Sequence, residues 1–144
     1  MDQPAVTASR PLPETAGLAS PFWSGLRERL LLIQRCSGCG TYRFPPEVAC
    51  FHCGSPEAGW APVSGRAALY SWTVAHPPLL PYFQERAPWP VACVELEEGP
   101  RLITNLVDVP LAEYRIGMPL QADFQDVEED VTLLVFRARA GREG

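Results

Sequence analysis

Four of the five cysteines in this chain lie between residues 36 and 53 and form two C-x-x-C pairs. Cys36 and Cys39 make the first pair, Cys50 and Cys53 make the second, and a glycine follows each pair. Four thiolates with this spacing are typical of a tetrahedral metal site. A glycine tolerates positive φ, so the chain can turn tightly there and aim backbone amides at the sulfur atoms. The sequence therefore predicts that these four cysteines bind one metal ion.

The predicted metal site is structural rather than catalytic, because four thiolates fill the coordination shell and a catalytic zinc ion keeps one position open. Zinc is the expected metal, and its binding would stabilise the fold. Iron in a rubredoxin-like electron-transfer site is the less favoured alternative. It accepts the same ligands, but nothing else in the chain points to redox chemistry. In a reducing compartment, C-x-x-C pairs also favour a metal over disulfides.

Residues that could act in catalysis are few in this sequence. His52 lies inside the second cysteine pair, where we expect it to face solvent rather than to replace a ligand. His76 precedes two prolines and would have to serve any stand-alone enzyme, such as a small thioesterase or decarboxylase. Cys93 lies in an apolar strand and is expected to be buried and inert. The sequence contains no nucleophile elbow, phosphate-binding loop or dinucleotide motif, so we expect no catalysis by the chain alone.

Acidic residues outnumber basic ones by 17 to 12, which gives a net charge of -5 at pH 7. General nucleic-acid binders neutralise phosphates with basic residues, so this class of protein is disfavoured. The pairs Glu97–Glu98 and Glu128–Glu129 are adjacent residues in predicted turns, and we expect them on solvated hairpin tips. No apolar run has the length of a membrane helix, and the first residues lack the pattern of a signal peptide. We therefore expect a cytoplasmic protein without membrane contact.

The expected elements divide the chain into four segments. Residues 1–19 are rich in Pro, Ala, Ser and Thr and are expected to form a flexible tail, with a second tail at residues 141–144. Residues 20–62 begin with a short amphipathic helix at Ser20, continue as an apolar strand and contain the cysteine pairs. Residues 63–140 are richer in β-branched and aromatic residues in alternating patterns, which predicts strands.

Residues 63–140 have the element order of a five-stranded Greek-key barrel of the OB type. We therefore predict a mainly β fold, in which an N-terminal helix and a rubredoxin-like zinc ribbon precede an OB barrel. Turn residues around Trp60 are expected to link the ribbon to the barrel. The predicted barrel strands cover 65–76, 90–99, 101–109, 118–127 and 131–139, with a short helix over 108–117.

An unusually apolar arm, residues 76–91, separates the first two predicted barrel strands. It contains five prolines and several large apolar side chains, a density that ordinary surface loops avoid because it invites association. Prolines also lower the entropy cost of presenting a surface. We expect the arm either to contact another subunit or an acyl ligand, or to fold back as a lid over its own barrel. Its candidate contact residues are Leu79, Leu80, Tyr82, Phe83 and Trp89.

The order of these motifs resembles that of a known family. This is the acyl-CoA-associated OB-fold family with an N-terminal rubredoxin-like zinc ribbon, long catalogued as a domain of unknown function. The resemblance covers about residues 20–139. It rests on the Phe-Trp helix, both cysteine pairs, "SGR" before the first barrel strand, "EEGPRL" and "RIGMPL".

The resemblance implies a non-catalytic accessory subunit in a hetero-oligomer. Its partner would be a thiolase-like enzyme, a steroid side-chain aldolase of that superfamily or a hotdog-fold enoyl-CoA hydratase, whose acyl-CoA site it would help to form. The implied setting is lipid or steroid side-chain metabolism. The resemblance also implies that Cys36, Cys39, Cys50 and Cys53 are the zinc ligands.

Two further sets of residues follow from the chemistry of possible ligands. If the complex contacts CoA, arginines near loops are candidates for its phosphates, because guanidinium groups pair bidentately with phosphate. These arginines are Arg66, Arg86 and Arg101. A single-stranded nucleic-acid-binding module is the alternative from another class, and it would stack bases on aromatic side chains in a positive groove. The candidate stacking residues are Tyr70, Trp72 and Phe124.

Overall fold

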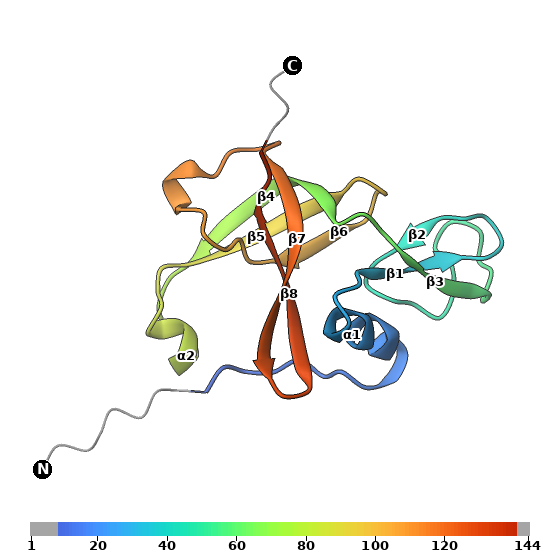
Figure 1. The fold of residues 1–144 in the computed structure, drawn as a ribbon, viewed down its shortest axis with the longest axis horizontal. Coiled ribbons are helices and arrows are strands. Elements are labelled where there is room, and N and C mark those ends of the chain that lie inside the picture. Colours follow the sequence, from blue (N-terminus) through green and yellow to red (C-terminus); the bar gives the residue numbers. More distant parts are fainter. Residues whose placement is uncertain (1–8, 141–144) are drawn as a thin grey trace, which may run out of the picture.

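The structure is a computed structural model that describes residues 9–140, and it confirms the predicted mainly β architecture. A three-stranded ribbon sheet lies at one end of the molecule, a five-stranded curled sheet forms most of the rest, and one short helix packs beside both (Figure 1). Residues 1–8 and 141–144 fall outside the described residues, so the tails predicted there stay a prediction, as do the domain boundaries.

The ribbon sheet consists of β1 (Leu32–Cys36), β2 (Tyr42–Arg43) and β3 (Ala58–Pro62), with β1 in the centre. Both outer strands run antiparallel to β1. β3 occupies residues for which the sequence predicted a turn around Trp60. A turn was expected because Ala, Gly and Pro are poor strand formers. Pairing with β1 along its whole length overrides that local preference.

Helix α1 (Ser20–Arg27) begins within one residue of the predicted start and follows a 3-10 turn, η1 (Gly17–Ala19). Its inner face buries Phe22 and Leu26, which are 4% and 0% exposed. The chain turns back toward β1 at Arg29, whose φ of 63° is incompatible with a continued helix. Within residues 9–140, neither α1 nor any other helix is long and apolar enough to span a membrane.

The second sheet is an OB-type half-barrel of five strands: β4 (Arg66–Ala75), β5 (Trp89–Leu96), β6 (Arg101–Thr104), β7 (Pro119–Glu128) and β8 (Val131–Ala138). Their order is β6-β5-β4-β7-β8, and all neighbours are antiparallel. A parallel bridge between Leu106 and Phe136 brings the two edges together, and Val107 N–H donates to Phe136 O at 2.9 Å. This closure of the last strand beside the third is the Greek-key topology of the OB barrel.

The two long connections within the half-barrel are mostly irregular. The arm between β4 and β5 contains a one-turn helix, α2 (Pro81–Gln84), that the sequence did not predict. Between β6 and β7, the short helix predicted over 108–117 is a single 3-10 turn, η2 (Leu111–Glu113). Asp108, just before this turn, adopts a φ of 58°, and its carboxylate pairs with Arg137 on β8.

One hydrophobic core joins the ribbon end of the molecule to the half-barrel. Leu26 of α1 and Ile33 of β1 are both 0% exposed. They share this core with Leu69, Val94 and Phe136 of the half-barrel, each at most 1% exposed. Full burial of such a side chain stabilises the fold by roughly 1.5–3 kcal/mol. We therefore expect the ribbon and the half-barrel to fold and unfold together.

An ion pair ties the chain after α1 to the β7–β8 hairpin. Arg29 Nη1 and Nη2 donate to Asp126 Oδ1 and Oδ2 at 3.0 and 2.6 Å. Arg29 and then the Thr132 hydroxyl lower the pKa of Asp126 from its ordinary value of 3.8 to about 2. Because the folded pKa lies below the unfolded one, the carboxylate stabilises the fold above about pH 4 and loses this contribution as the pH falls toward 2.

We expect Asp126→Asn to flatten the pH dependence of the free energy of unfolding between about pH 4 and pH 2, because it removes the titrating carboxylate. Urea unfolding at a series of pH values measures this dependence. Asp130→Asn is the matched control, since Asp130 lies exposed in the turn between β7 and β8. If Asp126→Asn keeps the wild-type slope, the ion pair contributes nothing to acid stability.

Candidate functional site

The four cysteines predicted to bind a metal lie together in the ribbon. Their sulfur atoms all fall within 4.8 Å of one another. Cys36 Sγ lies 3.6 Å from Cys53 Sγ, and Cys39 Sγ lies 3.7 Å from Cys50 Sγ. A tetrahedral zinc ion with Zn–S bonds of about 2.3 Å requires sulfur atoms about 3.8 Å apart. The cluster therefore has the dimensions of a four-sulfur zinc site.

Two matching backbone turns position the sulfur atoms. Gly40 N–H donates to Cys36 O at 2.9 Å, and Gly54 N–H donates to Cys50 O at 2.8 Å. Both glycines have a φ of 79°, a left-handed conformation that glycine adopts without steric cost. In the second turn, His52 N–H donates to Cys50 Sγ at 3.3 Å, which favours a negative charge on this sulfur.

The thiols differ in pKa because backbone amides and neighbouring sulfur atoms hydrogen-bond them unequally. The Cys39 backbone amide lowers the pKa of Cys36 to about 6, and the Cys53 amide lowers the pKa of Cys50. For Cys53, the Ser55 amide lowers the pKa, but hydrogen bonds with Cys36 and Cys39 outweigh it and raise the pKa to about 11. Several thiolates this close together need a cation to neutralise them. The residues present therefore fit a structural divalent metal.

A buried arginine fixes the loop between the two cysteine pairs. Arg43 is 2% exposed, and its Nε donates to Gln34 Oε1 at 2.9 Å. Arg43 Nη2 and Gln34 Nε2 both donate to Glu47 O, at 3.1 and 3.0 Å. No local pattern predicts this network, because one arginine in a two-residue strand does not indicate burial.

The arm folds into a small aromatic cluster of its own. The ring centres of Tyr82 and Phe83 lie 5.1 Å apart, and that of Trp89 lies 5.0 Å from Phe83 and 6.4 Å from Tyr82. All three rings are half-buried, as is Leu79, whereas Leu80 is 60% exposed. The arm is therefore a compact module, and its contact with a partner stays a prediction.

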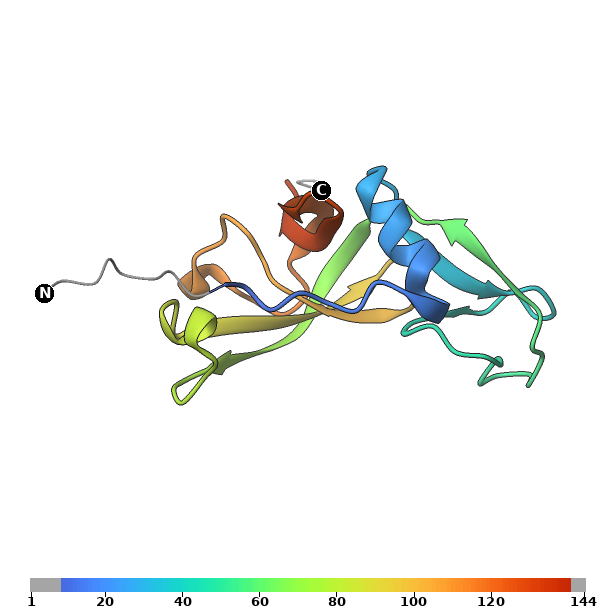
Figure 2. The same ribbon diagram turned by 90° about the horizontal axis from the view of Figure 1, so that it is seen from below.

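Residues 9–16 run past this module as an extended segment (Figure 2). Arg10 Nη1 donates to Tyr82 Oη at 3.1 Å, and the guanidinium lies 5.3 Å from the Tyr82 ring centre and 5.8 Å from that of Trp89. Arg86 lies over the Tyr82 ring as well, at 3.6 Å. Such cation–π contacts are worth about 0.5–2 kcal/mol each. Part of the predicted tail therefore holds the arm in place.

The three arginines predicted to meet CoA phosphates lie on different elements and already have neighbours in this chain. On β4, Arg66 Nε donates to Glu97 at 2.7 Å, and on β6, Arg101 Nε donates to Glu95 at 2.9 Å. β5 separates these two strands, and Arg86 lies on the arm. Their role toward phosphate stays a prediction.

The remaining candidate residues are spread over the molecule. His52 is exposed at the second cysteine pair, His76 is exposed just after β4, and Cys93 is half-buried on β5. Each aromatic ring considered for base stacking packs against a side chain of this chain. Tyr70 lies 3.8 Å under the Arg101 guanidinium, Trp72 is 5.7 Å from Tyr114, and Phe124 is 6.0 Å from the Arg29 guanidinium.

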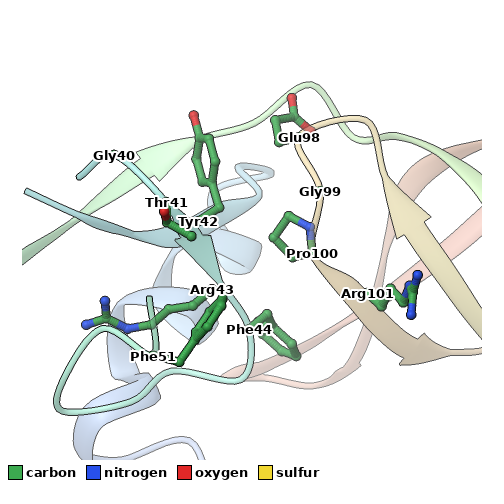
Figure 3. A pocket seen from close by; sticks show the side chains of 10 residues that line it. All are labelled: Gly40, Thr41, Tyr42, Arg43, Phe44, Phe51, Glu98, Gly99, Pro100 and Arg101. Atoms are coloured by element: carbon green, nitrogen blue, oxygen red, sulfur yellow. The ribbon is translucent and has the colours of Figure 1, made fainter. Parts of the chain in front are cut away.

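A cleft of about 550 Å³ lies between the ribbon and the half-barrel (Figure 3). Tyr42, Phe44 and Phe51 line its ribbon side, and the turn between β5 and β6 lines the other with Glu98 and Pro100. Glu98 does not lie on a fully solvated hairpin tip as predicted, because one of its carboxylate oxygens is buried. No local pattern predicts the cleft, since its two walls come from segments far apart in the chain.

Comparison with protein families matches both parts of the chain. Residues 23–57 match the family described as "ChsH2, rubredoxin-like zinc ribbon domain", and residues 60–125 match "ChsH2, C-terminal OB-fold domain". A solved chain of the "Ltp2-ChsH2(DUF35) aldolase" is 38% identical, with a TM-score of 0.75 over 94% of this chain and 98% of that one. A DUF35 protein of unknown function from Sulfolobus solfataricus, 17% identical with a TM-score of 0.55, shares the fold.

Curated relatives fall into two groups by length. A "Probable enoyl-CoA hydratase alpha subunit" of Thermomonospora curvata is 42% identical over 85% of this chain, which spans only 38% of that relative. The "3-oxo-4,17-pregnadiene-20-carboxyl-CoA hydratase alpha subunit" of Mycobacterium tuberculosis is 36% identical over 73% of this chain, which spans 33% of it. A "DUF35 domain-containing scaffold protein" of Methanocaldococcus jannaschii is 36% identical over 75% of this chain, which spans 77% of it. The chain belongs to the ChsH2/DUF35 family, in which a rubredoxin-like zinc ribbon precedes an OB fold.

Proposed function

We propose that this chain is a non-catalytic accessory subunit that binds a thiolase-like aldolase or an enoyl-CoA hydratase and helps form its acyl-CoA site. The proposal rests on the similarity to a chain of the solved "Ltp2-ChsH2(DUF35) aldolase". That chain is 38% identical to this one, and the match covers 98% of its length. The two hydratase alpha subunits, 42% and 36% identical, support a hydratase as the other candidate partner. A steroid-derived CoA thioester is the favoured substrate class, since one of these relatives is named for such a compound.

The metal in this proposal is zinc, held by Cys36, Cys39, Cys50 and Cys53, with iron as the alternative. When bound, it would fix the shape of the ribbon and carry out no step of a reaction, because four thiolates leave no open coordination position. The spacing of the sulfur atoms supports this assignment, as their closest pairs lie 3.6 and 3.7 Å apart. Metal analysis of the purified chain should find one zinc per chain.

The chain's own contribution would be shape and contact surface. The ribbon and the half-barrel share one core, so the surface of the ribbon keeps a fixed position relative to that of the half-barrel. The arm adds an aromatic module and the exposed Leu80. A rigid surface of this kind loses little conformational entropy on binding. We therefore infer that the arm contacts the enzyme and is buried in the complex.

Co-expression tests this proposal directly. The full chain is produced with each thiolase-like aldolase and each enoyl-CoA hydratase subunit encoded by the same genome, and the products are separated by size-exclusion chromatography with light scattering. We expect a stable hetero-oligomer with one of them, and thioester turnover by the complex but not by the isolated chain. A chain that stays free of every candidate, or that turns over a thioester alone, would contradict the proposal.

A further inference from the structure

The cleft between the ribbon and the half-barrel has an aromatic end and a polar end. Figure 3 shows the Phe44 and Phe51 rings near one end, and the Tyr42 hydroxyl and the Glu98 carboxylate at the other. Pro100 forms the wall on the barrel side. The volume of about 550 Å³ is in the range of sites that accept a small ligand or a few side chains.

The aromatic end includes an apolar side chain that the fold leaves uncovered. Phe51 is 75% exposed, although it is large and apolar. Phe51 directly follows Cys50, whose N–H donates to Ser55 O at 2.9 Å within the metal-binding turn. An apolar side chain on such a fixed backbone loses little entropy when another surface covers it, and aromatic residues of this kind dominate many interfaces.

The polar end contains an acceptor without a donor. Glu98 Oε2 accepts the Ser64 N–H at 3.0 Å, but Glu98 Oε1 is buried and has no hydrogen-bond partner among residues 9–140. Two arginines also line the cleft, but neither reaches Glu98. Arg101 is paired with Glu95. The Arg43 guanidinium points away from Glu98 and donates to Gln34 and the Glu47 carbonyl, with its Nη1 buried and without a partner among residues 9–140 (Figure 3). A buried acceptor is unfavourable until a donor reaches it, and a carboxylate binds a cationic donor most strongly. The polar end therefore favours a basic group.

We propose that this cleft binds an extended segment of the partner enzyme, which presents an apolar side chain to the aromatic end and an arginine or lysine to Glu98. The inference rests on the proposed function and names where the partner binds. The net charge of -5 favours the same occupant, because an acidic chain attracts a basic surface. A protein segment fits better than a small ligand, since small-ligand pockets enclose most of their ligand and Phe51 stands 75% exposed.

The test uses the full chain and the aldolase or hydratase that forms the complex on co-expression. Isothermal titration calorimetry gives the Kd of the wild type, Phe51→Ser and Glu98→Gln at low and moderate salt. We expect each variant to raise the Kd on the order of tenfold or more, and Glu98→Gln to weaken its dependence on salt. Zinc content and thermal unfolding should match those of the wild type, because Phe51 is exposed and glutamine can still accept the Ser64 N–H.

Two matched controls change similar side chains outside the cleft. Ile116→Ser alters an apolar side chain that is 65% exposed between η2 and β7, and Glu129→Gln alters an exposed carboxylate in the β7–β8 turn. Both should bind the partner as the wild type does.

Each other outcome overturns the inference in a distinguishable way. If the wild type forms the complex and the cleft variants bind equally well, the cleft is not the docking site, although the proposed function stands. If Phe51→Ser changes only the self-association of the isolated chain, the occupant is a second copy. If the wild type binds no candidate enzyme, the proposed function and this inference both fail.

Discussion

Replacing Cys36 with serine is expected to abolish stoichiometric metal binding and to unfold the ribbon. Cys36 ends β1, is 2% exposed and lies 3.6 Å from the Cys53 sulfur. Zinc contributes on the order of 10 kcal/mol of apparent folding free energy in thiolate modules, so the loss of one ligand should cost several kcal/mol. Because β1 shares its core with the half-barrel, the barrel should lose stability with the ribbon.

Metal analysis and urea unfolding, followed by the fluorescence of the tryptophans, measure these two effects. Cys93→Ser is the matched control, since Cys93 lies on β5 away from the four-sulfur cluster and should leave one zinc per chain. If Cys36→Ser binds one zinc with wild-type stability, Cys36 is not a metal ligand.

Truncating Phe136 to alanine is expected to lower the free energy of unfolding by about 3–5 kcal/mol, the usual cost of removing a buried phenylalanine ring. Phe136 is 0% exposed and belongs to the core that joins the ribbon to the half-barrel. Its backbone also closes the barrel, because it accepts from Val107 N–H and donates to Asn105 O at 3.1 Å. The alanine variant keeps these backbone bonds, so the expected loss comes from packing alone.

Urea unfolding at neutral pH checks this loss. Phe51→Ala is the control, because the same change at a side chain that is 75% exposed should cost no more than about 0.5 kcal/mol. Equal stability losses in the two variants would mean that the ring of Phe136 is not packed in the core as described.

The sequence was sufficient to predict the structure wherever the spacing of one residue type, or a regular alternation of side chains, determines it. Cysteine spacing singled out the four sulfur atoms that the fold brings within 4.8 Å. Alternating β-branched and aromatic residues placed β4, β7 and β8 to within one residue at each end, because each contributes side chains to the core. β6 is shorter than predicted, since its pairing with β5 ends at Thr104 and only a single bridge from Leu106 to Phe136 on β8 follows.

The features that the sequence left out depend on contacts between distant segments. β3 exists because β1 needs a partner on its second edge, which overrides the poor strand propensity of its residues. Arg10 reaches Tyr82 across more than half of the described chain, and no local pattern indicates this contact. The cleft has the same origin, because Phe51 and Glu98 line one cavity only once the ribbon has packed on the half-barrel.

The common core of Leu26, Ile33, Leu69 and Phe136 crosses the seam at which the two family descriptions divide the chain, near residues 57–60. Separating the chain at that seam would expose apolar core side chains of each half to water. We therefore expect this seam to separate two sequence descriptions but not two units that fold independently.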